Sequence, residues 1–462
     1  MATVAPYPAR PGRGAELGLL ALALGTSIYA FAQVSLAMTG ELTTDFKRFA
    51  IGYPALALVV HVLLRLRAAY ADPVILPVAV LLNGTGLAMI YRLALRYQVS
   101  QPEFGQIFSR QLIWTALGVV AAVCVLGFLR DHRTLRRFTY TTMLLGLAGL
   151  VLPLVPGIGV EQGGARIWIR LGQMSFQPAE ISKILLTIFF AGYLVTRRET
   201  LALAGPKFLG LRLPRPRDLG PIMGAWLASL AVLIFEKDLG TSLLFFGLFV
   251  AILYIATDRP SWIAIGLLLF SGGVVVAWRL FAHLQTRVDT WLDPFADYYE
   301  SGYQLSNGLF GLASGGLMGT GWGKGRPDLT SLAFSDFIVD SLGEELGLTG
   351  LFAILICFLL LVQRGMRAAM GVRDGFGTLL ASGLAFAIAL QVFVVVGGVT
   401  RLIPLTGLTT PFLAAGGSSL VANWMIVALL LRVSDGARRP PPATHEIDVA
   451  GLMAAEEGSQ AA

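Results

Sequence analysis

Charged side chains that border long apolar stretches are the residues of this sequence with the clearest chemical potential. Lys183 follows Glu180 by three residues, so the two side chains would share one face of the helix that Pro178 begins. Arg166 and Trp168 lie shortly before them. Two interpretations stay open: an ordinary ion pair next to an aromatic anchor, or a cationic pocket in which Arg166 and Lys183 bind a pyrophosphate.

Asp238 and Arg401 occupy two further breaks between apolar stretches. Asp238 lies at the turn between two such stretches, where it is either a helix N-cap or a carboxylate of a site. Arg401 is the only charged residue in the segment 397–419, which is interrupted by glycines and prolines. Irregular backbone at membrane depth is tolerated where it lines a cavity. Arg401 is therefore either an anchor that reaches the interface or a contact for a head group or pyrophosphate.

The longest polar segment, residues 283–345, contains a glycine-rich run and a set of carboxylates. Glycines at positions 319, 321, 323 and 325 would let the backbone approach a bulky ligand and expose amide groups to anions. Lys324, inside this run, is a natural phosphate contact. The combination predicts a site for an anionic ligand more specifically than a glycine-rich loop alone. The carboxylates beside the run are Asp297, Asp336, Glu344 and Glu345.

The same segment contains an amphipathic stretch from Tyr303 to Leu312. Its apolar residues would allow it to lie in the membrane interface. A lipid-linked substrate presents its head group at that depth.

The composition requires a membrane around the elements that position these residues. Apolar residues make up 55% of the chain and charged residues 14%, whereas a soluble domain carries roughly 25% charged residues. The apolar blocks are about 17 to 22 residues long, the length that crosses a hydrocarbon core. Because lipid offers the backbone no hydrogen-bond partner, such blocks must be helices. The sequence therefore predicts an all-α polytopic membrane protein, a helical bundle of about 12 transmembrane helices.

Twelve membrane spans can be placed along the chain. They lie at residues 17–37, 50–67, 74–91, 112–129, 139–156, 179–196, 220–235, 239–256, 261–281, 346–363, 376–396 and 416–433. We expect residues 283–345, between the ninth and tenth spans, to form one long extracytoplasmic loop.

The spans divide the chain into a core and its extensions. Residues 1–16 are predicted to be a cytoplasmic tail, 17–73 two additional N-terminal helices, 74–433 the core of about 10 helices, and 434–462 a disordered cytoplasmic tail. Lys and Arg concentrate in the short loops on the side of both termini, which the positive-inside rule assigns to the cytoplasm. The net charge of +7 is therefore explained by basic loops that orient the protein in a plasma (inner) membrane, and no nucleic-acid partner is expected.

These blocks, in this order, resemble the signature of the SEDS family, which contains the RodA, FtsW and SpoVE proteins. The matching segments are 176–183, 238–241, 294–304, 336–347 and 403–419. The sequence is most similar to actinobacterial RodA-type members, which share the two additional N-terminal spans, Arg401 and the sequence of residues 396–411. The sequence departs from the family pattern at Ile167, Ser335 and Ala415.

The resemblance implies a SEDS-type helical bundle and a peptidoglycan glycosyltransferase. Such an enzyme polymerises lipid II into β-1,4 glycan strands for cell elongation and shape, and works with a class B penicillin-binding protein, a transpeptidase. The essential external-loop aspartate of the family falls on Asp297. The residues of the matched blocks that would support it are Glu180, Asp238, Gln304, Asp336, Glu344 and Glu345.

The chemistry of this reaction assigns roles to the charged residues. An α-linked donor and a β-linked product require inversion, which needs a base for the acceptor hydroxyl and stabilisation of the departing pyrophosphate. Asp297 is the predicted base, with Asp293 as the alternative. A divalent cation, Mg²⁺ or Mn²⁺, would bridge Asp297 to phosphate, although no metal-ligand spacing requires it. The cations predicted to bind the pyrophosphate are Arg166, Lys183, Lys324 and Arg401.

Two other functions are compatible with the sequence. A lipid II flippase would use the same cationic cavity but would need no single irreplaceable carboxylate. A non-catalytic scaffold explains the spans but not the charge clusters. For Asp297 itself, the alternative is a turn-forming aspartate, which is common in loops.

Overall fold

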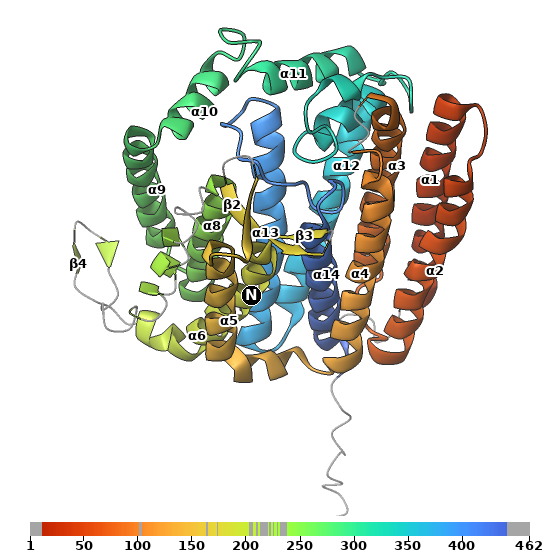
Figure 1. Cartoon of the computed structure of the whole chain (residues 1–462). Helices are drawn as coiled ribbons and strands as arrows, with labels where there is room; N and C mark the ends of the chain where they lie inside the picture. The colour runs from red at the N-terminus through yellow and green to blue at the C-terminus, as the bar shows by residue number, and fades with distance from the viewer. Residues whose placement is uncertain are drawn as a thin grey trace, which may run out of the picture.

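Long apolar helices that run alongside one another make up most of the structure (Figure 1). The computed structural model describes residues 12–100, 104–162, 165–172, 174–202 and 238–440, with short pieces between residues 202 and 238. Within these residues eleven helices are long and apolar enough to cross a membrane. The predicted all-α membrane fold is therefore confirmed.

The spanning helices follow the predicted order. They are α1 (Arg13–Thr39), α2 (Thr44–Arg67), α3 (Ile75–Ser100), α4 (Ile107–Phe128), α5 (Thr139–Val151) with the 3-10 turns η2 (His132–Phe138) and η3 (Leu152–Leu154), α6 (Pro178–Ala202), α8 (Leu239–Thr257), α9 (Ser261–Leu280), α12 (Ile338–Gly371), α13 (Gly375–Val399) and α14 (Gly417–Arg438). Eleven predicted spans correspond to these helices. Half of the predicted span 220–235 lies outside the described residues, and its described residues are helical.

Several helices extend beyond the apolar windows that predicted them. Helix α1 begins at Arg13, α14 continues to Arg438, and α12 begins at Ile338 instead of near residue 346. The added turns carry charges that are neutralised inside the protein, such as the Arg13–Glu16 ion pair. Hydropathy does not detect such turns because it scores a paired charge like a solvated one.

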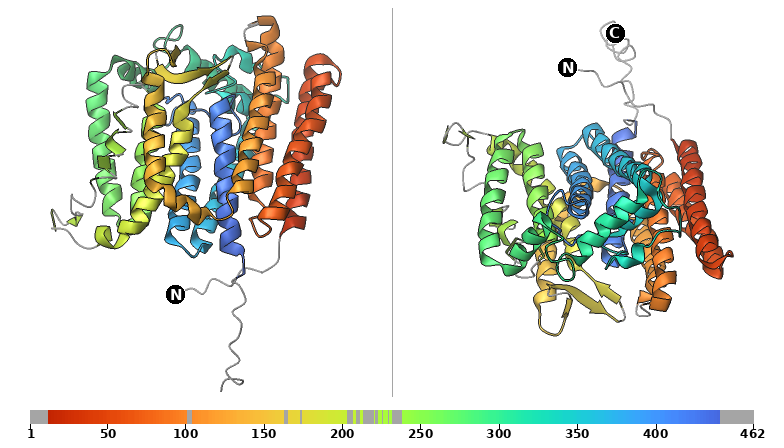
Figure 2. Two further views of the ribbon diagram at one scale, coloured as in Figure 1. Left: turned by 60° about the horizontal axis from the view of Figure 1, so that its bottom comes forward. Right: turned by 90° about the horizontal axis from the view of Figure 1, so that it is seen from above.

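The beginning of α1 and the end of α14 lie at the same end of the bundle (Figure 2). Arg13 and Arg438 both donate to the carbonyl of Ala71, between α2 and α3. We call this the lower end and the opposite one the upper end. The assignment of the lower end to the cytoplasm stays a prediction.

Helices α3, α6, α13 and α14 form the buried centre of the bundle, while α1, α2 and α9 lie at its edges (Figure 2). Helices α1 and α2 pack against α3 and α4. Helix α9 buries only Trp262 and Gly266. The polar residues of the site therefore have to come from the ends of the central helices.

The upper end carries the smaller elements. A three-stranded antiparallel sheet of β1 (Gly159–Gln162), β2 (Ala165–Leu171) and β3 (Met174–Phe176) has the order β1-β2-β3. Residues 283–345 are largely helical, since they contain α10 (Ala282–Leu292), α11 (Tyr303–Gly315), η4 (Pro327–Leu329) and the first turns of α12. The amphipathic stretch predicted from Tyr303 is α11. A short hairpin of β4 (Lys207–Phe208) and β5 (Leu211–Arg212) lies apart from them.

Candidate active site

A buried ion pair of Lys183 and Glu180 lies near the upper end of α6, the helix that Pro178 begins. Lys183 Nζ lies 2.8 Å from Glu180 Oε2 and 2.9 Å from Gln391 Oε1 of α13. Gln391 Nε2 donates to the carbonyl of Thr409 over 2.9 Å. Because the charges are paired and also hydrogen-bonded, the protein tolerates them in its interior.

Asp238 stands close to this pair, at the start of α8. Its Oδ1 accepts from the backbone N–H of Thr241 at 2.9 Å, so the N-cap considered from the sequence is confirmed. Its Oδ2 accepts from Gln177 Nε2 at 3.1 Å. Burial raises the pKa of Asp238, the hydrogen bonds from Thr241 oppose this shift, and the nearby charge of Glu180 adds to it.

Arg287 of α10 brings a second cation to this region. Its Nη1 donates to the carbonyl of Leu405, in the segment between α13 and α14, over 3.1 Å. Burial lowers the pKa of Arg287, while the charges of Asp336 and Asp238 oppose that shift. Burial also raises the pKa of Asp336, although Ser335 Oγ donates to its carboxylate at 3.0 Å. Arg287 is therefore within electrostatic reach of two carboxylates.

A glycine allows the segment between α13 and α14 to rest directly on α8. A Cβ atom at Gly240 would lie 2.7 Å from the carbonyl oxygen of Thr406 and 2.7 Å from Leu408 Cγ. Segments that are far apart in the sequence therefore meet at the start of α8. We call the following side chains the buried polar centre: the buried Glu180, Lys183, Asp238 and Gln391 together with the half-buried Arg287.

Asp297 lies outside the buried polar centre, in the exposed turn between α10 and α11. Its Oδ2 accepts from the backbone N–H and the hydroxyl of Ser301, at 3.1 and 2.8 Å. A Cβ atom at Gly302 would lie 1.9 Å from the carbonyl oxygen of Pro294, so the turn is tight. Asp297 therefore shapes its own turn, while its carboxylate remains exposed. Its catalytic role stays a prediction.

Arg401 makes its contacts with the end of α10. Its Nε donates to the carbonyl of Trp291 over 2.8 Å, and its Nη2 to the carbonyl of Leu292. A cation at the last carbonyls of a helix satisfies unpaired acceptors and favours the helix dipole. Arg401 is thus already engaged by the protein, and its predicted pyrophosphate contact stays a prediction.

The glycine-rich run packs on a break in α12. Gly347 interrupts this helix with φ 69° and ψ −174°. The amide of Gly321 donates to the carbonyl of Glu345 at 2.9 Å, and the amide of Gly323 to Glu345 Oε2 at 2.8 Å. A Cβ atom at Gly319 would lie 2.3 Å from the same carbonyl. The expectation that these amides are open to an anionic ligand is wrong for Gly321 and Gly323, because Glu345 of α12 accepts from both.

Arg92 of α3 binds two carboxylates beside the glycine-rich run. It is buried, and its Nε lies 2.7 Å from Glu345 Oε1 while its Nη1 lies 3.3 Å from Asp328 Oδ1. Burial by itself would raise the pKa of Asp328, but Arg92 and Arg96 hold it below its ordinary value. Glu344 Oε1 accepts from the backbone N–H of Arg326. Glu344 and Glu345 therefore hold the glycine-rich run in place.

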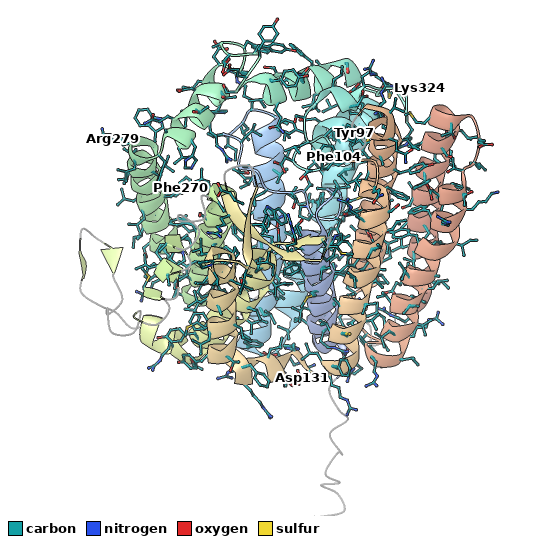
Figure 3. All side chains as sticks on the ribbon, viewed as in Figure 1. Tyr97, Phe104, Asp131, Phe270, Arg279 and Lys324 are labelled. Carbon is teal, nitrogen blue, oxygen red and sulfur yellow. The ribbon has the colours of Figure 1, made fainter. Side chains whose placement is uncertain are left out.

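The remaining predicted site residues are spread over the upper end. Lys324 is exposed and lies at the edge near α3, opposite Arg279 at the end of α9 (Figure 3). Arg166 is half-buried on β2. Gln304 of α11 donates to the carbonyl of Ser331 over 2.9 Å. Of the four predicted pyrophosphate cations, only Lys183 belongs to the buried polar centre.

Three polar residues of this region were not singled out from the sequence: Gln391, Arg287 and Arg92. Gln391 is a lone amide within an apolar span, and that isolation was the signal that could have found it. Arg287 was hidden inside the long polar segment. Arg92 lies one residue beyond the predicted third span, where it resembles an ordinary flanking charge.

A metal ion at Asp297 would find few protein ligands. Within the described parts of the chain, no group of three or more His, Cys, Asp or Glu side chains is arranged to hold a metal. A cation there would need phosphate and water for most of its coordination. We therefore derive no chemical step through a metal.

Comparisons with known proteins agree with this architecture. The family model for FtsW, RodA and SpoVE, described as "Cell cycle protein", matches residues 73–439. Peptidoglycan glycosyltransferase RodA of Mycobacterium tuberculosis is 48% identical over 441 residues, which cover 95% of this chain and 94% of the relative.

Two solved structures are similar in fold. A chain from a peptidoglycan synthase complex superposes with a TM-score of 0.66 and 24% identity, over 80% of this chain and 99% of that one. The rod shape determining protein RodA of Thermus thermophilus gives a TM-score of 0.54 and 25% identity, over 79% of this chain and 96% of that one.

Proposed function

The chain belongs to the SEDS family of RodA, FtsW and SpoVE proteins, and we propose that it is a peptidoglycan glycosyltransferase that polymerises lipid II into β-1,4 glycan strands. The observation that carries this proposal is the match to a peptidoglycan glycosyltransferase over 95% of the chain. The similarity to rod shape determining proteins supports cell elongation and shape as the process that it serves.

The buried polar centre supports the departure of a pyrophosphate. An ammonium group has three N–H donors, and Lys183 uses two of them on Glu180 and Gln391. Arg287 has five donors, of which one is bonded to Leu405. Lys183 and Arg287 can therefore add hydrogen bonds to a developing anion, and the burial of Lys183 limits competition from water. Arg166, Lys324 and Arg401 lie outside this centre.

We propose an inverting displacement in which Asp297 removes the proton of the acceptor hydroxyl. Its exposed carboxylate in the upper turn supports this role, since a lipid-linked acceptor presents its sugar at the membrane surface. Asp293 is the alternative base from the same segment. Asp336, which is half-buried, is a further alternative, because a raised pKa suits proton transfer near neutral pH. If a divalent cation takes part, it would bridge Asp297 to phosphate.

The partner that we propose is a class B penicillin-binding protein, which would cross-link the new strands. The support is the family resemblance and the fold shared with a chain from a peptidoglycan synthase complex that coordinates polymerization and crosslinking. Both ends of the described chain lie at the lower end, where the basic loops gather, which supports cytoplasmic termini. Cysteine-accessibility labelling of intact cells near residue 438 would test that orientation.

The test of the function is polymer synthesis from lipid II by purified protein, with and without the partner. A glycosyltransferase produces long glycan strands from lipid II in detergent, where there are no two leaflets to connect. A flippase produces no polymer there but moves labelled lipid II across the bilayer of a vesicle. Transport without polymer would overturn the proposal in favour of the flippase.

A further inference from the structure

The end of α10 is joined to the segment between α13 and α14 by a reciprocal set of hydrogen bonds. Arg401 donates to the carbonyls of Trp291 and Leu292. In return, the indole N–H of Trp291 donates to the carbonyl of Arg401 over 3.1 Å. Each residue is thus both donor and acceptor toward the other, and we call this pair the Trp291–Arg401 clasp.

A third contact extends the attachment along the same face of α10. Arg287 lies four residues before Trp291, so the two side chains leave the helix on one side. Arg287 Nη1 donates to the carbonyl of Leu405, four residues after Arg401. Helix α10 therefore lies along this segment with contacts at two successive positions.

The backbone of Arg401 is held in a conformation that favours the clasp. Its φ is +61°, a left-handed value that residues other than glycine rarely adopt. Such a conformation is retained when surrounding interactions determine it. The residue that follows a helix often takes this conformation, and here the amides of Leu402 and Ile403 both donate to the carbonyl of Gly397. The side chain and the carbonyl of Arg401 bond to α10 in addition, so the clasp adds to the interactions that hold this conformation.

Other packing around α10 is sparse. Thr290 is its only buried residue, and the preceding helix α9 buries only Trp262 and Gly266 within the part of the protein described. The position of the end of α10 therefore depends mainly on the Trp291–Arg401 clasp and on Arg287.

A short chain of hydrogen bonds leads from the clasp to the predicted base. Thr290 Oγ1, next to Trp291, donates to Ser301 Oγ over 3.3 Å. Ser301 Oγ and its amide both donate to Asp297 Oδ2. The last turn of α10 and the turn that carries Asp297 thus form one unit, and the clasp fixes that unit to the segment 401–409.

The same segment continues into the buried polar centre. Its Thr409 carbonyl accepts from Gln391, whose side-chain oxygen accepts from Lys183. One continuous stretch of eight residues after Arg401 therefore connects the base at the surface to the cation in the interior.

We propose that Trp291 and Arg401 are positioning residues, which set the place of Asp297 relative to the buried polar centre during glycan polymerisation. This inference rests on the proposed function. Displacement of a reacting group by about 1 Å can slow a reaction about 10²-fold. Loss of the clasp would therefore reduce kcat, while loss of a ligand that binds the lipid II pyrophosphate equally before and during the reaction would mainly raise the KM for lipid II.

The experiment compares Trp291→Phe, Arg401→Lys, Arg401→Gln and the double variant Trp291→Phe/Arg401→Gln in lipid II polymerisation by the full-length protein with its partner. Trp291→Phe keeps the ring and removes only the N–H donor. Arg401→Lys keeps the charge and loses the planar fork that reaches two carbonyls. The matched controls are Trp278→Phe and Arg279→Gln at the exposed end of α9, where neither side chain joins the clasp.

We expect each clasp variant to lower kcat ten- to a hundredfold with KM changed less than threefold, and both controls to retain the parental rate. The double variant should be no slower than the slower single variant, because both changes break one unit. Fluorescence-detected size exclusion in detergent checks that each variant remains folded.

Three results would overturn the proposal. Near-parental kcat in folded Trp291→Phe would remove the role of the indole. Full rescue by Arg401→Lys together with a raised KM in Arg401→Gln would make Arg401 a substrate ligand. If the reductions in kcat of the two single variants multiply in the double variant, Trp291 and Arg401 act independently. A parental protein without polymerase activity would instead refute the proposed function, so the two failures are distinguishable.

Discussion

Lys183 and Glu180 act as one unit at the residue scale, since removal of either alone leaves a buried charge without its partner. Their side chains are 2% and 9% exposed. Breaking such a pair is far more destabilising than replacing both members, because the remaining ion keeps its desolvation penalty. This asymmetry allows the structural and the chemical contribution of Lys183 to be separated.

Lys183→Gln alone should lower the free energy of unfolding by about 3–5 kcal/mol, the range for a buried pair that loses one partner. The double variant Glu180→Gln/Lys183→Gln should recover much of that stability. It should still polymerise lipid II about 10²–10³-fold more slowly, as when one transition-state donor is lost. Thermal unfolding in detergent and initial polymerisation rates are the measurements. A double variant with the parental rate would exclude Lys183 from the chemistry.

Asp328 should make the stability of the protein depend on pH. Its pKa is lowered in the folded state by Arg92 and Arg96, so its stabilising contribution is complete above the unfolded value of about 3.9 and is lost as pH falls through the folded pKa. The stability difference between the parental protein and Asp328→Asn should be largest at pH 7 and shrink as pH falls below about 4. Unfolding temperatures measured from pH 7 to pH 3 give this difference. A gap that stays constant over that range would contradict the assignment.

The residue types of the buried polar centre were partly predictable. Glu180, Lys183 and Asp238 were recognisable because charges at the ends of apolar stretches are unusual. Their partners were not, since Gln391 lies 208 residues from Lys183 and Arg287 reaches Leu405 across 118 residues. Local pattern carries no information on which distant carbonyl or amide completes a network. The chemical roles of these residues stay predictions.

At the element scale, the glycine-rich run shows how one pattern can serve two purposes. Glycines in a loop permit close approach of the backbone to a ligand or to another backbone, and sequence does not distinguish the two. Here the run approaches α12 at Gly347, where the helix is broken. The carboxylates of Glu344 and Glu345 were predicted to be site residues because they lie beside the run. Glu345 accepts from the amide of Gly323 within it, and Glu344 accepts from the amide of Arg326 directly after it.

Gly347→Ala should destabilise the protein strongly, because its φ and ψ fall in a region that is essentially restricted to glycine. The new Cβ atom would lie 2.2 Å from the amide nitrogen of Gly319, so the run would also be displaced. We expect a loss of at least about 2 kcal/mol from these combined effects. Gly25→Ala in α1, where a Cβ atom meets nothing within 4 Å, is the matched control and should be neutral or stabilising. Equal unfolding temperatures for the two variants would contradict this account of the helix break.

At the scale of the whole molecule, the fold class was predictable from the composition and from the length of the apolar spans. The structure and the similar solved fold confirm an all-α membrane protein. Membrane helices are predictable because lipid permits few alternatives. The arrangement of the bundle was not predictable, since packing between apolar faces depends on shape and leaves no periodic signal. Within residues 283–345, α11 corresponds to the predicted amphipathic stretch, but α10 and the first turns of α12 were predicted to be loop because they are short and polar.

The central claim is that the molecule polymerises lipid II with Asp297 as its base, and Asp297→Asn tests it most directly. The variant keeps the shape of the side chain and an acceptor for Ser301, so it should fold like the parental protein. Removal of a general base slows a reaction by about 10²–10⁴-fold. The measurement is the initial rate of glycan synthesis from lipid II by the purified protein with its partner, with Asp293→Asn and Asp336→Asn in parallel. The account predicts active parental protein and a rate reduced at least about a hundredfold in folded Asp297→Asn. A near-parental rate in Asp297→Asn would contradict it, and loss of activity in one of the parallel variants would then move the base to that residue.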